Sequence, residues 1–423
     1  MHPVTIGPHP RITKGGGEIK ICNTLYWGTN QSWELEFTFD NDTLPLTAEL
    51  DPWLGVALLP AMQAGLDLKL TRPVSARLLQ NLPAIQSIFN TWDATYNKIK
   101  VTAPARSKPI YDAKRKTTCF FSAGIDSFYT VLNHLDEIDV LIHLDNPWAG
   151  EEGRARMLGK IKEAAHRLGK ELIIVKSNFR DFLDNYTEWD FSHGAALLTL
   201  AHLLAPYLSK VYMASAYTYA DLRPNGTHPL LDYLWSTEDL EVVHDGADTH
   251  KYIKTHIVAR NEIFLDCVRV CWLNIENEKN CGRCSKCLVT MVGLRLEGVL
   301  DRCPAFAVPL DLEYLANFHF EFSHQILDMY LDALESRGDD PELEAALRQA
   351  LVNSKSKILA VPAKGPEGMP GSDEMKELRR KVAYYEQPLR FQIVDKVNRI
   401  LNKNRSIHRA GEFLAHKVWH FLK

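Results

Sequence analysis

The feature that most constrains the fold of this chain is an alternation of short apolar runs with amphipathic stretches over residues 115–246. The apolar runs predict strands, and the stretches between them have helical spacing. Strands that alternate with helices form parallel βαβ units with right-handed crossovers, which predicts an α/β fold: a parallel sheet with helices on both faces. The predicted strands are TTCFFS (117–122), DVLIHLD (139–145), ELIIVKS (171–177), KVYMASA (210–216) and, as a candidate fifth, LEVVHDG (240–246).

The carboxyl ends of these strands are the first place to look for a site. In open α/β sheets, ligands bind in the crevice outside those ends. The residues that follow the strands are Ser122–Ser127, Asp145 with Asn146, Ser177 with Asn178, and Ser215–Tyr219.

The rest of the chain divides by pattern into four further parts. The first 108 residues mix alternating strands with two helical runs, and Ser75 could cap the second of them. A stretch rich in Pro and Gly reads as a linker. The predicted parts are a mixed α+β domain (1–108), the α/β domain (109–310), a helical segment (311–353), the linker (354–375) and a basic amphipathic tail (376–423).

Charge is distributed unevenly along the chain. The tail carries 12 Lys and Arg against 4 Asp and Glu, so its charge is +8 and the remainder carries −12. An acidic body argues against general nucleic-acid binding. Apolar residues recur at helical spacing in the tail, so it could lie on an anionic membrane surface, on an acidic partner or, slightly favoured, on the body of its own chain. No long apolar stretch or secretory signal is present, so the expected location is cytoplasmic.

The stretch SAGIDS, residues 122–127, joins the first predicted strand to a helix. Small residues let backbone N–H groups approach an anion closely, and a helix N-terminus adds a partial positive charge. Ser122 and Ser127 could donate hydroxyl hydrogen bonds, whereas Asp126 suits a magnesium ion better than a phosphate. A tight turn without any ligand is the alternative.

SAGIDS resembles the Ser-Gly-Gly-x-Asp-Ser signature of the PP-loop ATP pyrophosphatases, whose fold is similar to that of the adenine nucleotide alpha hydrolases. The resemblance implies that ATP and Mg²⁺ bind here, with Asp126 and Ser127 as catalytic residues. Ala123 stands where the family has Gly, which puts full activity in doubt. The nucleotide-binding residues that it implies are Ser122, Ala123, Gly124, Ile125, Asp126, Ser127 and Asp145.

Five of the eight cysteines fall between residues 267 and 287. Cys281, Cys284 and Cys287 have the spacing C-x2-C-x2-C, and Cys271 lies ten residues upstream. Four thiolates suit a tetrahedral zinc ion and leave no open position, which favours a structural site. Cys267 competes with Cys271 for the fourth place, and an iron–sulfur cluster or buried free thiols are alternatives.

A cysteine knuckle after such an α/β core is similar to that of the 7-cyano-7-deazaguanine synthases, and the likeness covers roughly residues 115–300. It implies that a substrate carboxylate, of a small molecule or a modified residue, is adenylated by ATP and then captured by ammonia or an amine. Residue 2 is His, so no N-terminal glutaminase cysteine is present and the amine is expected from outside. The oligomeric state stays open, a homodimer included.

Two other functions remain open from the sequence. One is sulfur transfer to a tRNA or nucleoside, for which Cys119, Cys267 and Cys303 are spare thiols. The other is a nucleotide sensor or scaffold without turnover, suggested by Ala123.

Further polar residues are weaker candidates. His193 and His202 lie on an apolar helical pattern and are expected to be hydrogen-bonded core or surface histidines without a functional role. The remaining candidates are Tyr217, Asp221, Arg223 and His228 at the substrate side, Lys251 and Lys254 near phosphate, and Arg283 and Lys286 within the knuckle.

Overall fold

The computed structural model describes residues 2–29, 31–111, 114–145, 151–271, 279–320 and 324–359. The predicted tail (376–423) and residues 360–375 of the predicted linker lie outside these residues, as does Asn146. By its internal contacts the chain divides into two compact units, Met1–Ala216 with Asn225–Lys355, and Tyr217–Pro224 with Ser356–Lys423. The description below concerns the first unit unless stated otherwise.

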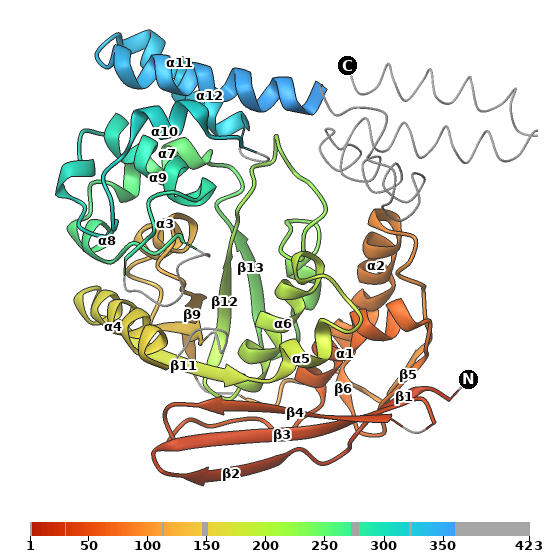
Figure 1. Ribbon diagram of the computed structural model, residues 1–423. Helices are drawn as coiled ribbons and strands as arrows, with labels where there is room; N and C mark the ends of the chain where they lie inside the picture. The colour runs from red at the N-terminus through yellow and green to blue at the C-terminus, as the bar shows by residue number, and fades with distance from the viewer. Residues whose placement is uncertain are drawn as a thin grey trace, which may run out of the picture. The chain divides into compact units, whose positions relative to one another are not determined.

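One large sheet runs through this unit (Figure 1). Its strand order is β13-β12-β9-β10-β11-β4-β3-β1-β5-β7, and β2 pairs with β3 beside this path. The strands are β1 (Val4–Ile6), β2 (Arg11–Gly15), β3 (Glu18–Trp27), β4 (Gln31–Phe39), β5 (Leu68–Lys69), β7 (Val101–Thr102), β9 (Lys116–Phe120), β10 (Val140–Leu144), β11 (Glu171–Ser177), β12 (Leu208–Ala214) and β13 (Glu241–Asp245). A second, two-stranded sheet pairs β6 (Val74–Ser75) with β8 (Ala105–Arg106).

The five strands predicted from the alternation form the parallel half of the sheet. They lie in the order β11-β10-β9-β12-β13, and each pairs in parallel with its neighbour. Cys119, Leu141 and Tyr212 are aligned across three of these strands and pack in the same core cluster. In chain order the arrangement reads 3-2-1-4-5, which is the order of a doubly wound sheet.

Helices cover both faces of this parallel half, as predicted. Val140 and Ile142 of β10 pack with residues of α1, α5 and α6, whereas Leu141 packs with residues of α3, α4 and α8. Figure 1 shows these two sets of helices on opposite sides of the strands. The helices are α1 (Asp51–Ala64), α2 (Ala76–Trp92), α3 (Ile125–Asn133), α4 (Glu151–Arg167), α5 (Phe179–Leu183), α6 (Trp189–Leu203), α7 (Lys251–Val258), α8 (Glu262–Cys267), α9 (Ser285–Leu296), α10 (Leu312–Asn317), α11 (His324–Arg337), α12 (Pro341–Leu359), and the 3-10 turns η1 (Asp232–Trp235) and η2 (Leu300–Arg302).

The N-terminal part extends the same sheet. β4 pairs antiparallel with β11 and β3 pairs antiparallel with β4, so residues before position 108 continue the sheet of the α/β half. Ser75 caps α2 as predicted, because its Oγ accepts the N–H of Leu78 over 3.0 Å. The predicted domain boundary at 108 stays a prediction, while the hydrogen bonding of the sheet crosses it.

The C-terminal helices α9 to α12 share a separate small core, which includes Leu288, Leu327 and Leu347. The predicted helical segment is thus present, with a break between α10 and α11. Within the described part of the chain, the helices are too short or too polar to cross a bilayer.

Candidate functional site

The turn between β9 and α3 is tight and strained at one residue. Ala123 has φ 57°, in the left-handed region, and it is the non-glycine residue with positive φ among the described residues. Gly124 then precedes α3 with extended backbone angles (φ −82°, ψ 167°). The chain therefore uses the conformation that glycine usually supplies, with an alanine in its place.

Two serines stabilise this turn from inside. Ser122 Oγ lies 3.3 Å from Ser127 Oγ and accepts the Gly124 N–H over 3.3 Å. Ser127 Oγ also lies 3.1 Å from the Gly124 carbonyl oxygen, to which it donates. The hydroxyls predicted to meet a phosphate are thus gathered at the N-terminus of α3.

The turn lies at the switch point of the sheet. The chain runs from β9 to β10 and β11 on one side, and β12 and β13 then add on the other side of β9. Ligands of doubly wound sheets bind at the carboxyl ends of the strands beside such a point. Residues 122–127 follow the carboxyl end of β9, so they occupy that place.

Asp126, in the first turn of α3, faces two lysines of α7. Lys251 Nζ donates to its Oδ2 over 2.7 Å, and Lys254 Nζ lies 3.6 Å from its Oδ1. Burial raises the pKa of the Asp126 carboxyl, but the charges of Lys251 and Lys254 outweigh burial and keep this pKa below its usual value. The carboxylate is therefore ionised and neutralised by cations from a segment 125 residues away.

Lys254 links this carboxylate to the end of a second strand. Its side chain is 2% exposed, and its Nζ donates to the Ser215 carbonyl oxygen over 2.7 Å. Burial lowers the pKa of Lys254, and the negative charge of Asp126 offsets part of that effect. An ammonium group thus bridges the ends of β12 and the β9–α3 turn.

The end of β10 adds a buried acid and a buried imidazole. Asp145, predicted from its position, is 1% exposed, and its N–H donates to the Val175 carbonyl oxygen over 2.8 Å. His143 was not predicted; its Nδ1 lies 2.8 Å from the Phe121 carbonyl oxygen, next to the turn. Burial lowers the pKa of His143, which favours the neutral imidazole.

The polar side chains that follow β11 connect two strands, although their position at a strand end had made them site candidates. Ser177 Oγ donates to the Glu36 carbonyl oxygen over 2.6 Å, and Asn178 Oδ1 accepts the Glu36 N–H over 2.8 Å. Both side chains hold β4 against β11, so these two candidates join the halves of the sheet.

The four predicted cysteines come together. The Sγ atoms of Cys271, Cys281, Cys284 and Cys287 all lie within 4.8 Å of one another, and the group could hold a metal ion such as zinc. Tetrahedral Zn–S bonds of about 2.3 Å place the sulfurs about 3.8 Å apart. The Cys281–Cys287 and Cys284–Cys271 separations are 3.8 and 4.0 Å, and the Cys284–Cys287 separation is 3.3 Å, so the sulfur geometry fits that ion.

The surroundings shift the thiol pKa values in opposite directions, because burial raises the pKa of Cys281 whereas hydrogen bonding favours the thiolate of Cys284. Cys281 Sγ accepts the N–H groups of Arg283 and Cys284 over 3.4 and 3.3 Å. The hydrogen bond with Cys287 lowers the pKa of Cys284 to about 5, and the same contact raises the pKa of Cys287. Gly282 has φ 71°, and a Cβ there would come within 2.6 Å of Val308, so this turn requires glycine. Cys267, the competing ligand, is not in the group.

The weaker candidates make hydrogen bonds and ring contacts within the folded chain. His202 is a core histidine as predicted: its Nε2 lies 3.0 Å from the Trp235 carbonyl oxygen, and burial lowers its pKa to about 4. His193 Nε2 lies 3.0 Å from the Thr227 hydroxyl. In the second unit, the Arg223 guanidinium lies over the Tyr217 ring at 4.7 Å and Thr218 donates to Asp221, contacts internal to that segment.

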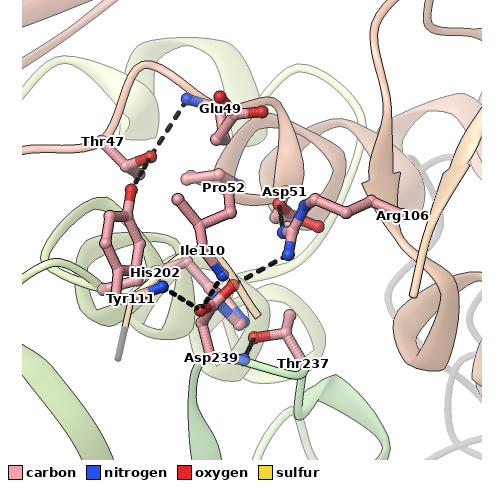
Figure 2. Close-up of a pocket in the computed structure, with 11 residues that line it drawn as sticks. Thr47, Glu49, Asp51, Pro52, Arg106, Ile110, Tyr111, His202, Thr237 and Asp239 are labelled. Carbon is pink, nitrogen blue, oxygen red and sulfur yellow. Dashed lines mark hydrogen bonds and ion pairs between the residues drawn. The ribbon is translucent and has the colours of Figure 1, made fainter. Parts of the chain in front are cut away.

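A polar pocket that the sequence did not suggest is built around Arg106 (Figure 2). Its guanidinium donates to Asp51 Oδ2 and to Asp239 Oδ2, each over 2.9 Å. Asp239 Oδ1 in turn accepts the N–H groups of Ile110 and Tyr111. These contacts hold residues 105–111 between α1 and the start of β13, so we interpret the pocket as a structural joint; none of its lining residues is a predicted ligand.

Searches against known protein families, curated proteins and solved structures find no match to this chain.

Proposed function

We propose that this chain is an ATP pyrophosphatase of the PP-loop type, which adenylates a substrate carboxylate and releases pyrophosphate. The observation that carries the proposal is the turn at residues 122–127: a left-handed residue and a helix N-terminus at the switch point of a doubly wound sheet. Backbone N–H groups and serine hydroxyls at such a turn suit a pyrophosphate.

The two lysines of α7 supply positive charge to the proposed site. Lys251 and Lys254 neutralise Asp126 in the structure. On binding of ATP, the two ammonium groups turn toward the phosphate oxygens, because these carry more negative charge than one carboxylate. Asp126, with Asp145 at the end of β10 as a second carboxylate, would then hold Mg²⁺.

The reaction is an attack by a carboxylate oxygen of the substrate on the α-phosphorus of ATP. A bond forms between that oxygen and the α-phosphorus, and the bond to the bridging α–β oxygen breaks, so the electron pair leaves with pyrophosphate. Mg²⁺ supplies neutralisation of the charge on the phosphates. Ammonia or an amine then displaces AMP to give an amide, or a nitrile after a second round. Positioning and charge stabilisation carry the rate.

Sulfur transfer, the second enzymatic alternative, is disfavoured by the spare thiols. Cys119, Cys267 and Cys303 are all buried, and burial raises the pKa of Cys267 and of Cys303 to about 11. A buried thiol with a raised pKa supplies little thiolate at neutral pH.

The test uses two matched variants, Asp126→Ala in the turn and Asp136→Ala at an exposed position after α3. Each protein is incubated with ATP, Mg²⁺ and a pool of candidate acids, and AMP and pyrophosphate are quantified. We expect AMP from the unsubstituted chain and from Asp136→Ala but not from Asp126→Ala. ATP binding without AMP in all three would favour the nucleotide sensor, and equal AMP in all three would refute the assigned turn.

A further inference from the structure

Residues 268–271 connect the metal centre directly to the strained turn. Cys271 belongs to the sulfur group, and Arg269, two residues earlier, donates its backbone N–H to the Ala123 carbonyl oxygen over 2.9 Å. A Cβ built on Gly124 would lie 3.5 Å from the Arg269 carbonyl oxygen. This connecting segment is therefore hydrogen-bonded to Ala123 and runs close to Gly124.

Asn280 holds the connecting segment in one conformation. Its Oδ1 accepts the N–H groups of Val270 and Cys271 over 2.9 and 3.0 Å, and its Nδ2 donates to the Val268 carbonyl oxygen over 2.9 Å. Asn280 is fully buried and directly precedes Cys281. The segment thus ends at Cys271 of the cysteine group, and it is held in place by Asn280, which directly precedes Cys281 of the same group.

Ala123 is the residue of the turn that most needs outside support. Its φ of 57° is disfavoured for a residue with a Cβ, because the Cβ crowds the following carbonyl oxygen. The hydrogen bond from Arg269 opposes relaxation of that conformation. A glycine would need no such restraint.

We propose that the Cys271–Cys287 metal centre positions the Ser122–Ser127 turn through Arg269 and Asn280. A bound metal fixes Cys271, and Cys271 keeps the Arg269 N–H in place beneath the Ala123 carbonyl. Removal of the metal releases this restraint, and the turn loses its ligand-ready conformation. The inference rests on the proposed function for the identity of the ligand, an ATP pyrophosphate, but the link between the two sites is physical and independent of it.

Amide hydrogen exchange on the full chain tests this link without any nucleotide. The metal-loaded protein is compared with protein stripped by a chelator, and peptides covering residues 121–128 and 18–27 are followed. We expect exchange of the turn peptide to accelerate about fivefold or more on stripping, while the peptide from β3 stays unchanged. Equal exchange of the turn peptide in both samples would overturn the proposal, because the metal would then have no effect on the turn. Faster exchange of both peptides on stripping would also overturn it, because the metal would then stabilise the whole fold.

Two cysteine variants separate the link from a general loss of packing. Cys271→Ser removes one ligand from the connecting segment, and Cys303→Ser changes an equally buried cysteine outside the group. Faster exchange at 121–128 is expected in Cys271→Ser alone. In the background of Ala123→Gly the effect of stripping should shrink, because glycine keeps the left-handed conformation unaided; an undiminished effect would contradict the role given to Ala123.

ATP affinity measured on the same samples distinguishes this inference from the proposed function. If exchange depends on the metal but ATP does not bind, the link stands and the nucleotide function fails. If ATP binds equally with and without metal and exchange is unchanged, the link fails and the function stands.

Discussion

The left-handed conformation of Ala123 costs free energy, and the burial of its methyl group offsets most of that cost. Replacement by Gly removes a left-handed strain of about 1–2 kcal/mol, but loses about 0.8 kcal/mol of methyl burial and adds about 0.5–1 kcal/mol of chain entropy. We therefore expect Ala123→Gly to change the free energy of unfolding by less than about 1 kcal/mol. Ala123→Val overpacks a fully buried site and should cost more than about 2 kcal/mol. Denaturant unfolding of the two variants checks this, and an equal loss in both would contradict the strain.

Gly194 of α6 is required by a close approach of two backbones. A Cβ at this position would lie 1.9 Å from the Gly226 carbonyl oxygen, so we expect Gly194→Ala to lower the free energy of unfolding by about 3 kcal/mol or more. Gly159 of α4 is the control, because a Cβ there meets nothing within 4 Å. Gly159→Ala should raise stability by about 0.5–1 kcal/mol, as helix propensity predicts. Thermal or denaturant melts that rank the two variants the other way would refute this packing.

His202 makes the stability of the fold sensitive to mild acid. Burial lowers its pKa from 6.5 to about 4, so between these pH values the unfolded chain binds a proton that the folded chain does not. Its contribution is therefore complete above about pH 6.5, and about 3 kcal/mol is lost as the pH falls to about 4. His202→Gln should flatten the pH dependence of unfolding in this window. An unchanged slope would show that His202 is not buried in its neutral form.

At the scale of elements, the parallel half of the sheet could be predicted because its signals are local. Each strand is a short apolar run bounded by polar residues, and the structure confirms β9 to β13 within a few residues of the predicted positions. The pairing of β4 with β11 could not be predicted, since no local pattern tells an N-terminal strand which edge it will join. It is fixed by side chains such as Asn178, whose amide holds the backbone of Glu36.

The candidate site, like the sheet, could be predicted only where the signal is local in the sequence. The cysteine site could be predicted because its spacing is a short motif, and the four cysteines converge as predicted. SAGIDS lies between β9 and α3 as its sequence context predicts, while its nucleotide role stays a prediction. The pairing of Lys251 and Lys254 with Asp126 joins α7 to α3 across 125 residues, and only the folded sheet brings these charges together. The left-handed conformation of Ala123 was also invisible in sequence, because alanine rarely adopts it.

The cysteine group forms a local element that could bind a metal ion. Four thiolates at these separations should retain about one zinc ion per chain, and removal of the ion should destabilise residues 268–271 and 279–287. Elemental analysis of the purified protein checks the stoichiometry. Iron with acid-labile sulfide would identify a cluster in place of zinc, and absence of any metal at equilibrium with added zinc would refute the site.

At the scale of the whole molecule, one sheet joins two regions that the sequence presents as separate. The parallel half positions the turn, the lysines and the carboxylates at its strand ends, and the antiparallel half extends the sheet from β11. The cysteine group borders the turn through residues 268–271. The sheet, the two lysines and the cysteine group therefore meet at this turn.

The proposed function requires that this turn direct cleavage of ATP between the α- and β-phosphates. The most direct measurement is the identity of the products when the full, metal-loaded chain is incubated with ATP, Mg²⁺ and a pool of carboxylic acids, resolved by mass spectrometry. We expect AMP and pyrophosphate in equal amounts from the unsubstituted chain, and neither from Asp126→Ala. Formation of ADP and phosphate, or AMP release that survives in Asp126→Ala, would contradict the proposed function.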